Sequence, residues 1–186
     1  IPFSELHAID HPANLYGTSK FGNEQIAAAY HNIHGLKSVG LRFFTVYGPW
    51  GRPDMAVSLF TNKIENGETI TLFNGGEMWR DFTFVDDIVQ GIELSMEYCS
   101  DNAAVFNLGN SKPVKLGYFL EQIEKRLGVK AKFKYQASNA EIKETYADVS
   151  KAHELLGYQP TTSIESGLDQ FMAWYKKLDK RTRDEW

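Results

Sequence analysis

Tyr16 and Lys20, four residues apart, are the side chains in this sequence best placed to move a proton. Residues i and i+4 share one face of a helix and lie about 6 Å apart along its axis. An ammonium group at that distance favours the phenolate and lowers the pKa of a tyrosine from its ordinary value of about 10. Such a tyrosine can exchange a proton with a substrate hydroxyl near neutral pH. Taken alone, however, this spacing is more often a chance pair on an ordinary helix.

Metal chemistry has little support in the sequence. His31 and His34 share a helix face, but two imidazoles without a third ligand make a poor site. The remaining histidines do not combine with the cysteine or with carboxylates at metal-ligand spacing; they are His7, His11 and His153. No metal is therefore expected.

Helices and strands alternate along the chain, which predicts an α/β fold with some parallel strand pairing. The alanine-rich segment 14–34, closed by Gly35, is the helix expected to carry Tyr16 and Lys20. The segment Val39–Val46 is β-branched and aromatic and predicts one buried strand. Further strands are expected over 69–73, 105–108 and 131–135. Further helices are expected over 116–127, from Asp86 onward, and after the capping residues Asp54, Ser150 and Ser163.

The composition is that of a soluble globular protein of 186 residues, with 42% hydrophobic and 24% charged residues. No apolar run approaches the roughly 18 residues that a membrane span needs, so no membrane partner is expected. The net charge of -4 argues against a nucleic-acid-binding surface, although local arginines could still hold an anionic ligand. Cys99 is the only cysteine, which excludes an internal disulfide and favours the reducing cytoplasm.

Four later segments give the Tyr16–Lys20 pair a wider context. They read Leu41-Arg42-Phe43-Phe44-Thr45-Val46-Tyr47-Gly48-Pro49, Trp79-Arg80-Asp81-Phe82-Thr83-Phe84-Val85-Asp86-Asp87, Phe106-Asn107-Leu108-Gly109 and Glu144-Thr145-Tyr146-Ala147-Asp148. In this order, behind a YxxxK helix, they resemble the extended short-chain dehydrogenase/reductase family, the NAD-dependent sugar epimerases and dehydratases. The resemblance covers nearly the whole chain.

This resemblance implies a partial Rossmann-like parallel sheet, with its C-terminal strands only, and a small mixed α/β substrate-binding subdomain. Residues 1–50 would be the remnant of the NAD-binding domain. Residues 51–186 would mainly bind the nucleotide sugar, with residues 80–110 returning to pack on the first part. The glycine-rich turn that receives a dinucleotide pyrophosphate is not found in this sequence. The chain is therefore expected to be a C-terminal fragment that is inactive alone and does not hold NAD tightly.

The resemblance also implies roles for individual residues. Tyr16 would be the catalytic base, and Lys20 would support it and hold the nicotinamide ribose. Phe43 and Val46 would join both of them in contacting the cofactor. Substrate contacts are implied for Thr45, Arg52, Thr71, Phe73, Arg80 and Glu141.

The two arginines of this set each have a structural alternative. The loop YGPWGRPDMA is similar to that of UDP-glucuronate 4-epimerases, so Arg52 would grip the uronate, since a guanidinium matches a carboxylate bidentately. The alternative is that Arg52 only braces its own loop. Arg80 would contact the nucleotide diphosphate, or would pair with a neighbouring carboxylate of Asp81, Asp86 or Asp87.

Two further substrate contacts are less well defined. Phe73 and Thr71 fall on the strand that contacts uracil in the family, but Phe73 is equally suited to a hydrophobic core. The family usually reads PGD where this chain reads Asn139-Ala140-Glu141, and this departure leaves the ribose contact of Glu141 open.

By resemblance, the intact enzyme interconverts UDP-glucuronate and UDP-galacturonate by hydride transfer through NAD and a 4-keto intermediate. A 4,6-dehydratase or a uronate decarboxylase is the alternative within the family, and a non-catalytic UDP-sugar-binding module is the alternative outside it. A homodimer through the helix 14–34 is also implied for the intact enzyme. No nucleic-acid partner is expected.

Overall fold

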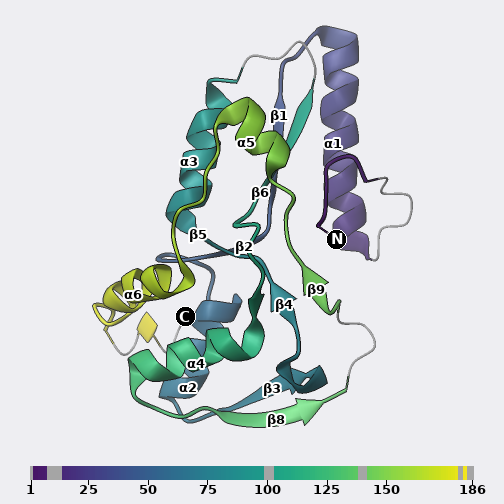
Figure 1. Cartoon of the computed structure of the whole chain (residues 1–186). Coiled ribbons are helices and arrows are strands. Elements are labelled where there is room, and N and C mark those ends of the chain that lie inside the picture. Colours follow the sequence, from purple (N-terminus) through teal and green to yellow (C-terminus); the bar gives the residue numbers. More distant parts are fainter. Residues whose placement is uncertain (1, 8–13, 99–102, 138–141, 180–181, 184–186) are drawn as a thin grey trace.

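The computed structural model describes residues 2–7, 14–98, 103–137, 142–179 and 182–183 (Figure 1). Its helices are α1 Leu15–His34, α2 Ala56–Glu65, α3 Val85–Met96, α4 Leu116–Leu127, α5 Ser150–Leu156 and α6 Ile164–Tyr175, with a 3-10 turn η1 at Asn74–Gly76. Its strands are β1 Val39–Phe43, β2 Thr45–Tyr47, β3 Thr69–Phe73, β4 Trp79–Arg80, β5 Phe82–Phe84, β6 Ala104–Leu108, β7 Val114–Lys115, β8 Lys132–Gln136 and β9 Glu144–Thr145. The alternation confirms the α/β class.

Parallel strand pairs form the half of the molecule that contains α1. Strand β1 pairs with β6 from Val39 opposite Ala104 to Phe43 opposite Leu108, and β2 pairs with β5. Helices α3 and α5 lie on one side of β1 and β6, and α1 stands on the other side (Figure 1). A Rossmann-like parallel arrangement is thus present. The division at residue 50 stays a prediction.

The other half contains the strand pair β3–β8, which is parallel, and the three-stranded sheet β7–β4–β9. In that sheet, β4 runs antiparallel to β7 and parallel to β9. Helices α2, α4 and α6 gather beside these strands (Figure 1). Mixed strand directions with helices packed against them confirm the mixed α/β character of this half.

Two hydrophobic cores hold the chain together. The larger one is aromatic, and Phe82 and Phe119 stack at its centre with 4.0 Å between ring centroids. The smaller one lies under α3 and α5 and includes Phe106 and Tyr158, both fully buried. Each aromatic side chain contributes about 150–250 Å² of buried surface, so these rings supply much of the hydrophobic stabilisation.

The expected single strand Val39–Val46 is wrong, because the chain changes partners within it. The amide of Phe44 donates to the carbonyl of Leu108 (3.2 Å), whereas the next amide, of Thr45, donates to the carbonyl of Asp81 (3.1 Å). The strand therefore leaves β6 and continues along β5. The sequence pattern does not show such a change, since both halves are rich in β-branched and aromatic residues.

Two of the three expected capping residues are wrong. Ser163 caps α6 by accepting a hydrogen bond from the amide of Ser166, and Asp86 lies in the first turn of α3. Asp54 does not cap α2, which begins at Ala56 without a side-chain cap. Ser150 is the first residue of α5, and its amide donates to Asp148 (3.0 Å).

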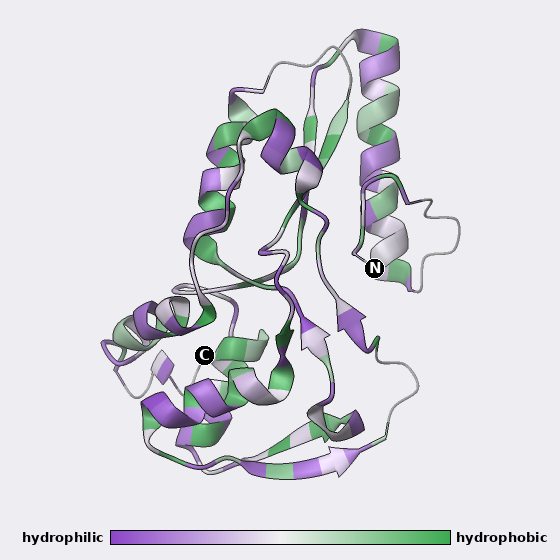
Figure 2. Cartoon of the chain, in the orientation of Figure 1, coloured by the Kyte–Doolittle hydropathy of each residue, from purple (hydrophilic) through white to green (hydrophobic). Residues whose placement is uncertain are grey.

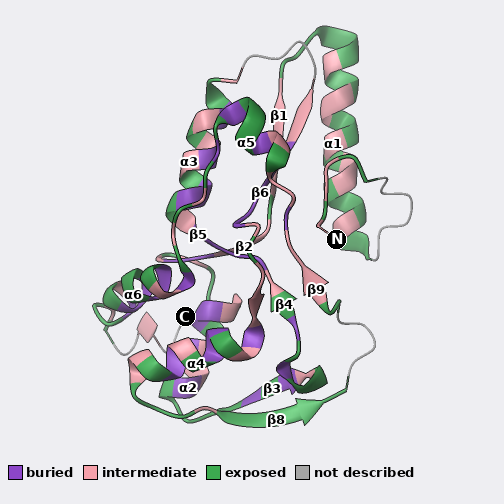
Figure 3. Ribbon diagram, viewed as in Figure 1, coloured by how far each residue is buried: buried purple, intermediate pink, exposed green. Residues whose placement is uncertain are grey.

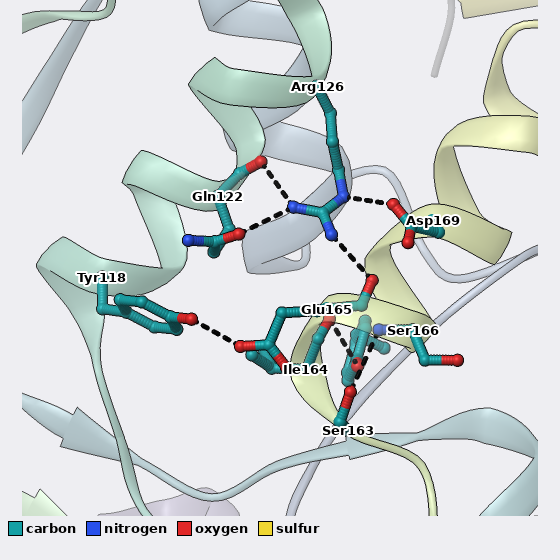
Figure 4. Close-up of polar contacts among 9 residues, drawn as sticks. Tyr118, Gln122, Arg126, Ser163, Ile164, Glu165, Ser166 and Asp169 are labelled. Atoms are coloured by element: carbon teal, nitrogen blue, oxygen red, sulfur yellow. Dashed lines mark hydrogen bonds and ion pairs between the residues drawn. The ribbon is translucent and has the colours of Figure 1, made fainter.

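A polar network fastens α4 to α6 (Figure 4). The Arg126 guanidinium donates to the Asp169 carboxylate at 2.7 Å and to the Glu165 carbonyl at 2.8 Å. The Tyr118 hydroxyl donates to the Glu165 carboxylate at 2.5 Å. The network therefore fixes the angle at which the C-terminal helix meets the larger core.

None of the helices in the described part of the chain has the length and apolar character to cross a bilayer. Within the same residues, no three histidine, cysteine or carboxylate side chains gather as a group that could bind a metal ion.

Candidate active site

Helix α1 begins and ends as its sequence predicts. The Asn14 side chain accepts a hydrogen bond from the amide of Gly17 (2.8 Å), which satisfies one free donor of the first turn. At the other end, Gly35 adopts φ 65° and donates to the carbonyl of His31. No residue of α1 is fully buried, in contrast to α3, α4 and α6 (Figure 3). The capping residues at its two ends therefore account for this helix better than the burial of its side chains does.

Tyr16 and Lys20 lie on the same face of α1. The Lys20 ammonium is 5.2 Å from the centroid of the Tyr16 ring, within the range of a cation–π contact. Both side chains line a cavity of about 670 Å³ between α1 and strand β1, and residues 103–105 at the start of β6 line it as well. Tyr16 is 72% exposed and can therefore meet a ligand. The arrangement places a phenol and a cation together at the wall of a cavity.

Glu24 and Arg42 line the same cavity and join α1 to β1. The Arg42 Nε and Nη2 atoms each donate to one oxygen of Glu24, both at 2.7 Å. The side chains of Arg42 and Glu24 are only 25% and 20% exposed. The hydrogen bond to Glu24 raises the pKa of the Arg42 guanidinium above its ordinary value. Sequence reasoning did not single out this pair, although Glu24 follows Lys20 by one more helical turn.

The other expected cofactor contacts divide between the cavity and the core. Phe43 lines the cavity and is half exposed. Val46 is partly buried, packs against the smaller hydrophobic core and is not among the residues that line the cavity. Thr45, expected to contact substrate, is partly buried in β2, where it pairs with Phe82. The structure therefore brings Tyr16, Lys20 and Phe43 together but does not add Val46 to them.

Arg52 lies in the exposed loop between β2 and α2. Its Nε and Nη2 atoms donate to the two oxygens of Asp54, at 3.0 and 2.9 Å. The pair is bidentate and mostly exposed, so its net contribution to stability is about 0–1 kcal/mol. Arg52 braces its own loop in this structure, and its guanidinium is still open to a stronger carboxylate ligand. Its role in gripping a uronate stays a prediction.

The remaining expected substrate contacts lie in the half of the molecule without α1. Thr71 is exposed on β3, and Phe73, at the end of that strand, packs partly against the larger core. The Arg80 side chain donates to the carbonyl of Trp79 at 2.9 Å. None of these three residues lines the cavity beside Tyr16. Glu141 lies outside the described residues.

Asp81, which sequence reasoning treated only as a possible partner of Arg80, is a fully buried hydrogen-bond acceptor. It accepts from the amides of Asn110 (2.7 Å), Ser111 (3.0 Å) and Ala147 (2.9 Å). Gly109 makes room for it, since a Cβ there would fall 2.6 Å from an Asp81 oxygen. This carboxylate ties two separate segments, residues 110–111 and Ala147, to the end of β4.

Asp87 has a similar structural task at the start of α3. It is buried and accepts from the amides of Thr161 (3.0 Å) and Thr162 (3.1 Å). Backbone amides therefore already satisfy two of the three carboxylates that were considered as partners for Arg80. This leaves the diphosphate role of Arg80 as a prediction.

Comparisons with known proteins agree with the motifs. A model of the NAD dependent epimerase/dehydratase family matches residues 1–109. An uncharacterized protein from Methanocaldococcus jannaschii is 49% identical over 176 residues, which are 94% of this chain and 54% of that protein. UDP-glucuronate 4-epimerase 1 of Arabidopsis thaliana is 42% identical over 192 residues, covering 94% of this chain and 45% of that protein.

Solved structures share the fold. The UDP-glucuronic acid 4-epimerase from Bacillus cereus, in complex with UDP-glucuronic acid and NAD, matches with a TM-score of 0.85 and 33% identity. The match covers 96% of this chain and 58% of that one. The chain thus spans about half the length of the curated relatives it matches.

Proposed function

The chain belongs to the NAD dependent epimerase/dehydratase family, and we propose that the whole protein interconverts UDP-glucuronate and UDP-galacturonate by inverting C4 of the sugar. The observation that carries the proposal is the Tyr16–Lys20 pair at the wall of the cavity beside β1. The relatives from Arabidopsis thaliana and Bacillus cereus are UDP-glucuronate 4-epimerases by name. Within the family, the open guanidinium of Arg52 favours a sugar that carries a carboxylate.

The residues at the cavity fit the nicotinamide end of NAD. The phenol of Tyr16 and the ammonium of Lys20 offer hydrogen-bonding groups for a ribose, and Phe43 offers an apolar surface for a ring. When bound, NAD supplies the hydride chemistry at C4 of the sugar. Because this sequence contains no glycine-rich turn, we propose that the rest of the whole protein holds the pyrophosphate and that this chain alone binds NAD weakly.

Proton transfer falls to Tyr16. Its phenolate takes the proton from O4 of the sugar as the C4–H bond breaks, and its phenol returns the proton when that bond reforms on the other face. Lys20 stabilises the phenolate by its charge. Arg52 holds the uronate carboxylate and so orients the sugar whichever face of its ring is presented.

In this proposal, the diphosphate end of the substrate binds to the half of the molecule that does not contain α1. Arg80 would pair with the diphosphate by charge-assisted hydrogen bonds. Thr71 and Phe73 would contact the uracil ring, and Thr45 the sugar. Glu141 would bind the ribose. With its single cysteine, the protein is proposed to work in the cytoplasm.

The test is an assay of the purified whole protein with NAD and UDP-glucuronate, with products identified by NMR. UDP-galacturonate is expected, and the Tyr16→Phe variant should lose activity by about a hundredfold or more, the usual contribution of a general base. A 4-keto-6-deoxy product or a pentose product would instead identify a dehydratase or a decarboxylase. Binding of the UDP sugar without any turnover would identify a binding module. This chain assayed alone should give no product.

A further inference from the structure

Three ionisable side chains lie on one face of α1 at intervals of four residues. They are Tyr16, Lys20 and Glu24, and all three line the cavity. The Lys20 ammonium therefore has an anionic candidate on either side: the phenolate of Tyr16 one turn before it, and the carboxylate of Glu24 one turn after it. Side chains at this spacing are close enough to form an ion pair. Whichever anion takes the ammonium reduces the charge felt by the other.

Arg42 decides this competition from the neighbouring strand. Both oxygens of Glu24 are occupied by the Arg42 guanidinium, at 2.7 Å each. A bidentate pair of this geometry, three-quarters buried, is stronger than a single contact to a flexible ammonium. Lys20 in turn lies over the Tyr16 ring.

The other charges around the cavity do not change this arrangement. The described lining contains four titratable side chains, which are Tyr16, Lys20, Glu24 and Arg42. The β6 wall, residues 103–105, carries none. Outside the lining, Glu5 lies near enough to Arg42 for its negative charge to favour the charged guanidinium. The Glu5 carboxylate also accepts a hydrogen bond from the amide of Asn107 (2.7 Å).

We propose that Arg42 is a positioning residue which binds Glu24 so that the Lys20 charge is left to Tyr16. The inference rests on the proposed function of Tyr16 as the proton acceptor. Without Arg42, the Glu24 carboxylate would be unpaired and would turn to Lys20, and the phenolate would lose part of its stabilisation. Arg42, on the strand that follows α1, thus acts on Tyr16 through Glu24 and Lys20.

Opposite substitutions should move Tyr16 in opposite directions. Arg42→Met should shift the acid limb of the pH profile of kcat to higher pH by about one unit, which leaves roughly tenfold less phenolate on that limb. Glu24→Gln removes the competing anion but keeps Arg42, so the limb should move to lower pH. The double variant should return close to the unsubstituted protein. Arg42→Lys keeps a positive charge beside Glu24, so the acid limb should lie close to its pH position in the unsubstituted protein.

The experiment uses the full-length protein and two readouts. The first is the pH dependence of kcat with UDP-glucuronate. The second is the ultraviolet difference spectrum of tyrosinate without substrate, in which each variant is compared with the same variant carrying Tyr16→Phe. Circular dichroism reports folding. If Arg42→Met does not fold, Glu24→Gln and Arg42→Lys still test the direction of the shift.

A clamp that only supports the helix would lower kcat in every variant without moving the tyrosinate titration in opposite directions. Unmoved titrations, or shifts of the same sign, would therefore overturn the inference. If the tyrosinate shifts appear but the unsubstituted protein does not epimerise UDP-glucuronate, the proposed function fails and the role of Arg42 stands. If the unsubstituted protein epimerises UDP-glucuronate normally but the titrations do not move, the proposed function stands and the role of Arg42 fails.

Discussion

At the scale of single residues, the pair between Arg52 and Asp54 distinguishes two interpretations of the substrate loop. If Arg52 binds the uronate, Asp54 competes with the substrate for the guanidinium. Asp54→Asn should then lower KM for UDP-glucuronate by up to about fivefold, the equivalent of roughly 1 kcal/mol for an exposed pair. Arg52→Lys should raise KM, since an ammonium cannot match a carboxylate bidentately. Steady-state kinetics of the whole protein measures both.

UDP-glucose provides the matched control for this prediction. It lacks the carboxylate, so its inhibition constant should not change in either variant. If Arg52 only braces the loop, Asp54→Asn should raise KM for UDP-glucuronate instead of lowering it. The sign of the change therefore decides between the two roles.

The candidate site was predictable where it depends on local spacing and not where it depends on the fold. The four-residue interval alone places Lys20 beside Tyr16. The acceptor role of Asp81 needs amides that lie 29 and 66 residues further along the chain, which no local pattern can bring together. Arg42 belongs to one of the motifs, but its pairing with Glu24 across the cavity depends on how α1 lies relative to β1.

At the scale of elements, the glycine-ended helix C-termini followed from the sequence, whereas two helix starts and the strand partners did not. Gly35 and Gly128 end α1 and α4 in the left-handed conformation, as their positions after amphipathic segments predict. The change of partner at Phe44 could not be read from a segment that stays rich in β-branched and aromatic residues on both sides of it. Pairing is a property of the sheet, and the sequence of one strand does not contain it.

The contact between α4 and α6 should make stability depend on pH in a defined window. The hydrogen bond from Tyr118 lowers the pKa of Glu165 below its ordinary value of 4.5, and the same bond to Glu165 raises the pKa of Tyr118 above its ordinary value of 10.0. A depressed carboxyl pKa stabilises the fold above pH 4.5, and this contribution is lost as the pH falls through the folded value. A raised phenol pKa stabilises below pH 10.0, and this contribution is lost as the pH rises through the folded value.

Tyr118→Phe should therefore lower the melting temperature most between these two limits, with a difference that shrinks outside them. Thermal unfolding followed by circular dichroism at several pH values measures the effect. Tyr135→Phe, at an exposed tyrosine on β8, is the control and should change little at any pH. A constant difference across the whole pH range would mean that the ring, not its hydroxyl, holds α4 to α6.

At the scale of the whole molecule, α1 presents two faces with different tasks. Tyr16, Lys20 and Glu24 face the cavity. Leu15, Ile26 and Ile33 recur at spacings of eleven and seven residues, which places them together on another face. Ile26 and Ile33 are 58% and 73% exposed, and the helix as a whole mixes hydrophobic and hydrophilic residues (Figure 2). An exposed apolar stripe beside a candidate active site fits an interface between two copies of the whole protein.

We therefore expect the whole protein to form a dimer through α1, and the double variant Ile26→Lys with Ile33→Lys to be monomeric, because four buried ammonium groups would have no partners at such an interface. Sedimentation across a range of concentrations measures the mass. Met96→Lys is the control: Met96 is also exposed, at 80%, but it lies on α3, on the other side of β1 and β6, so this variant should remain dimeric. An unsubstituted protein that stays monomeric at all concentrations would contradict the expectation. A dimer that survives the double substitution would place the interface on another surface of the protein.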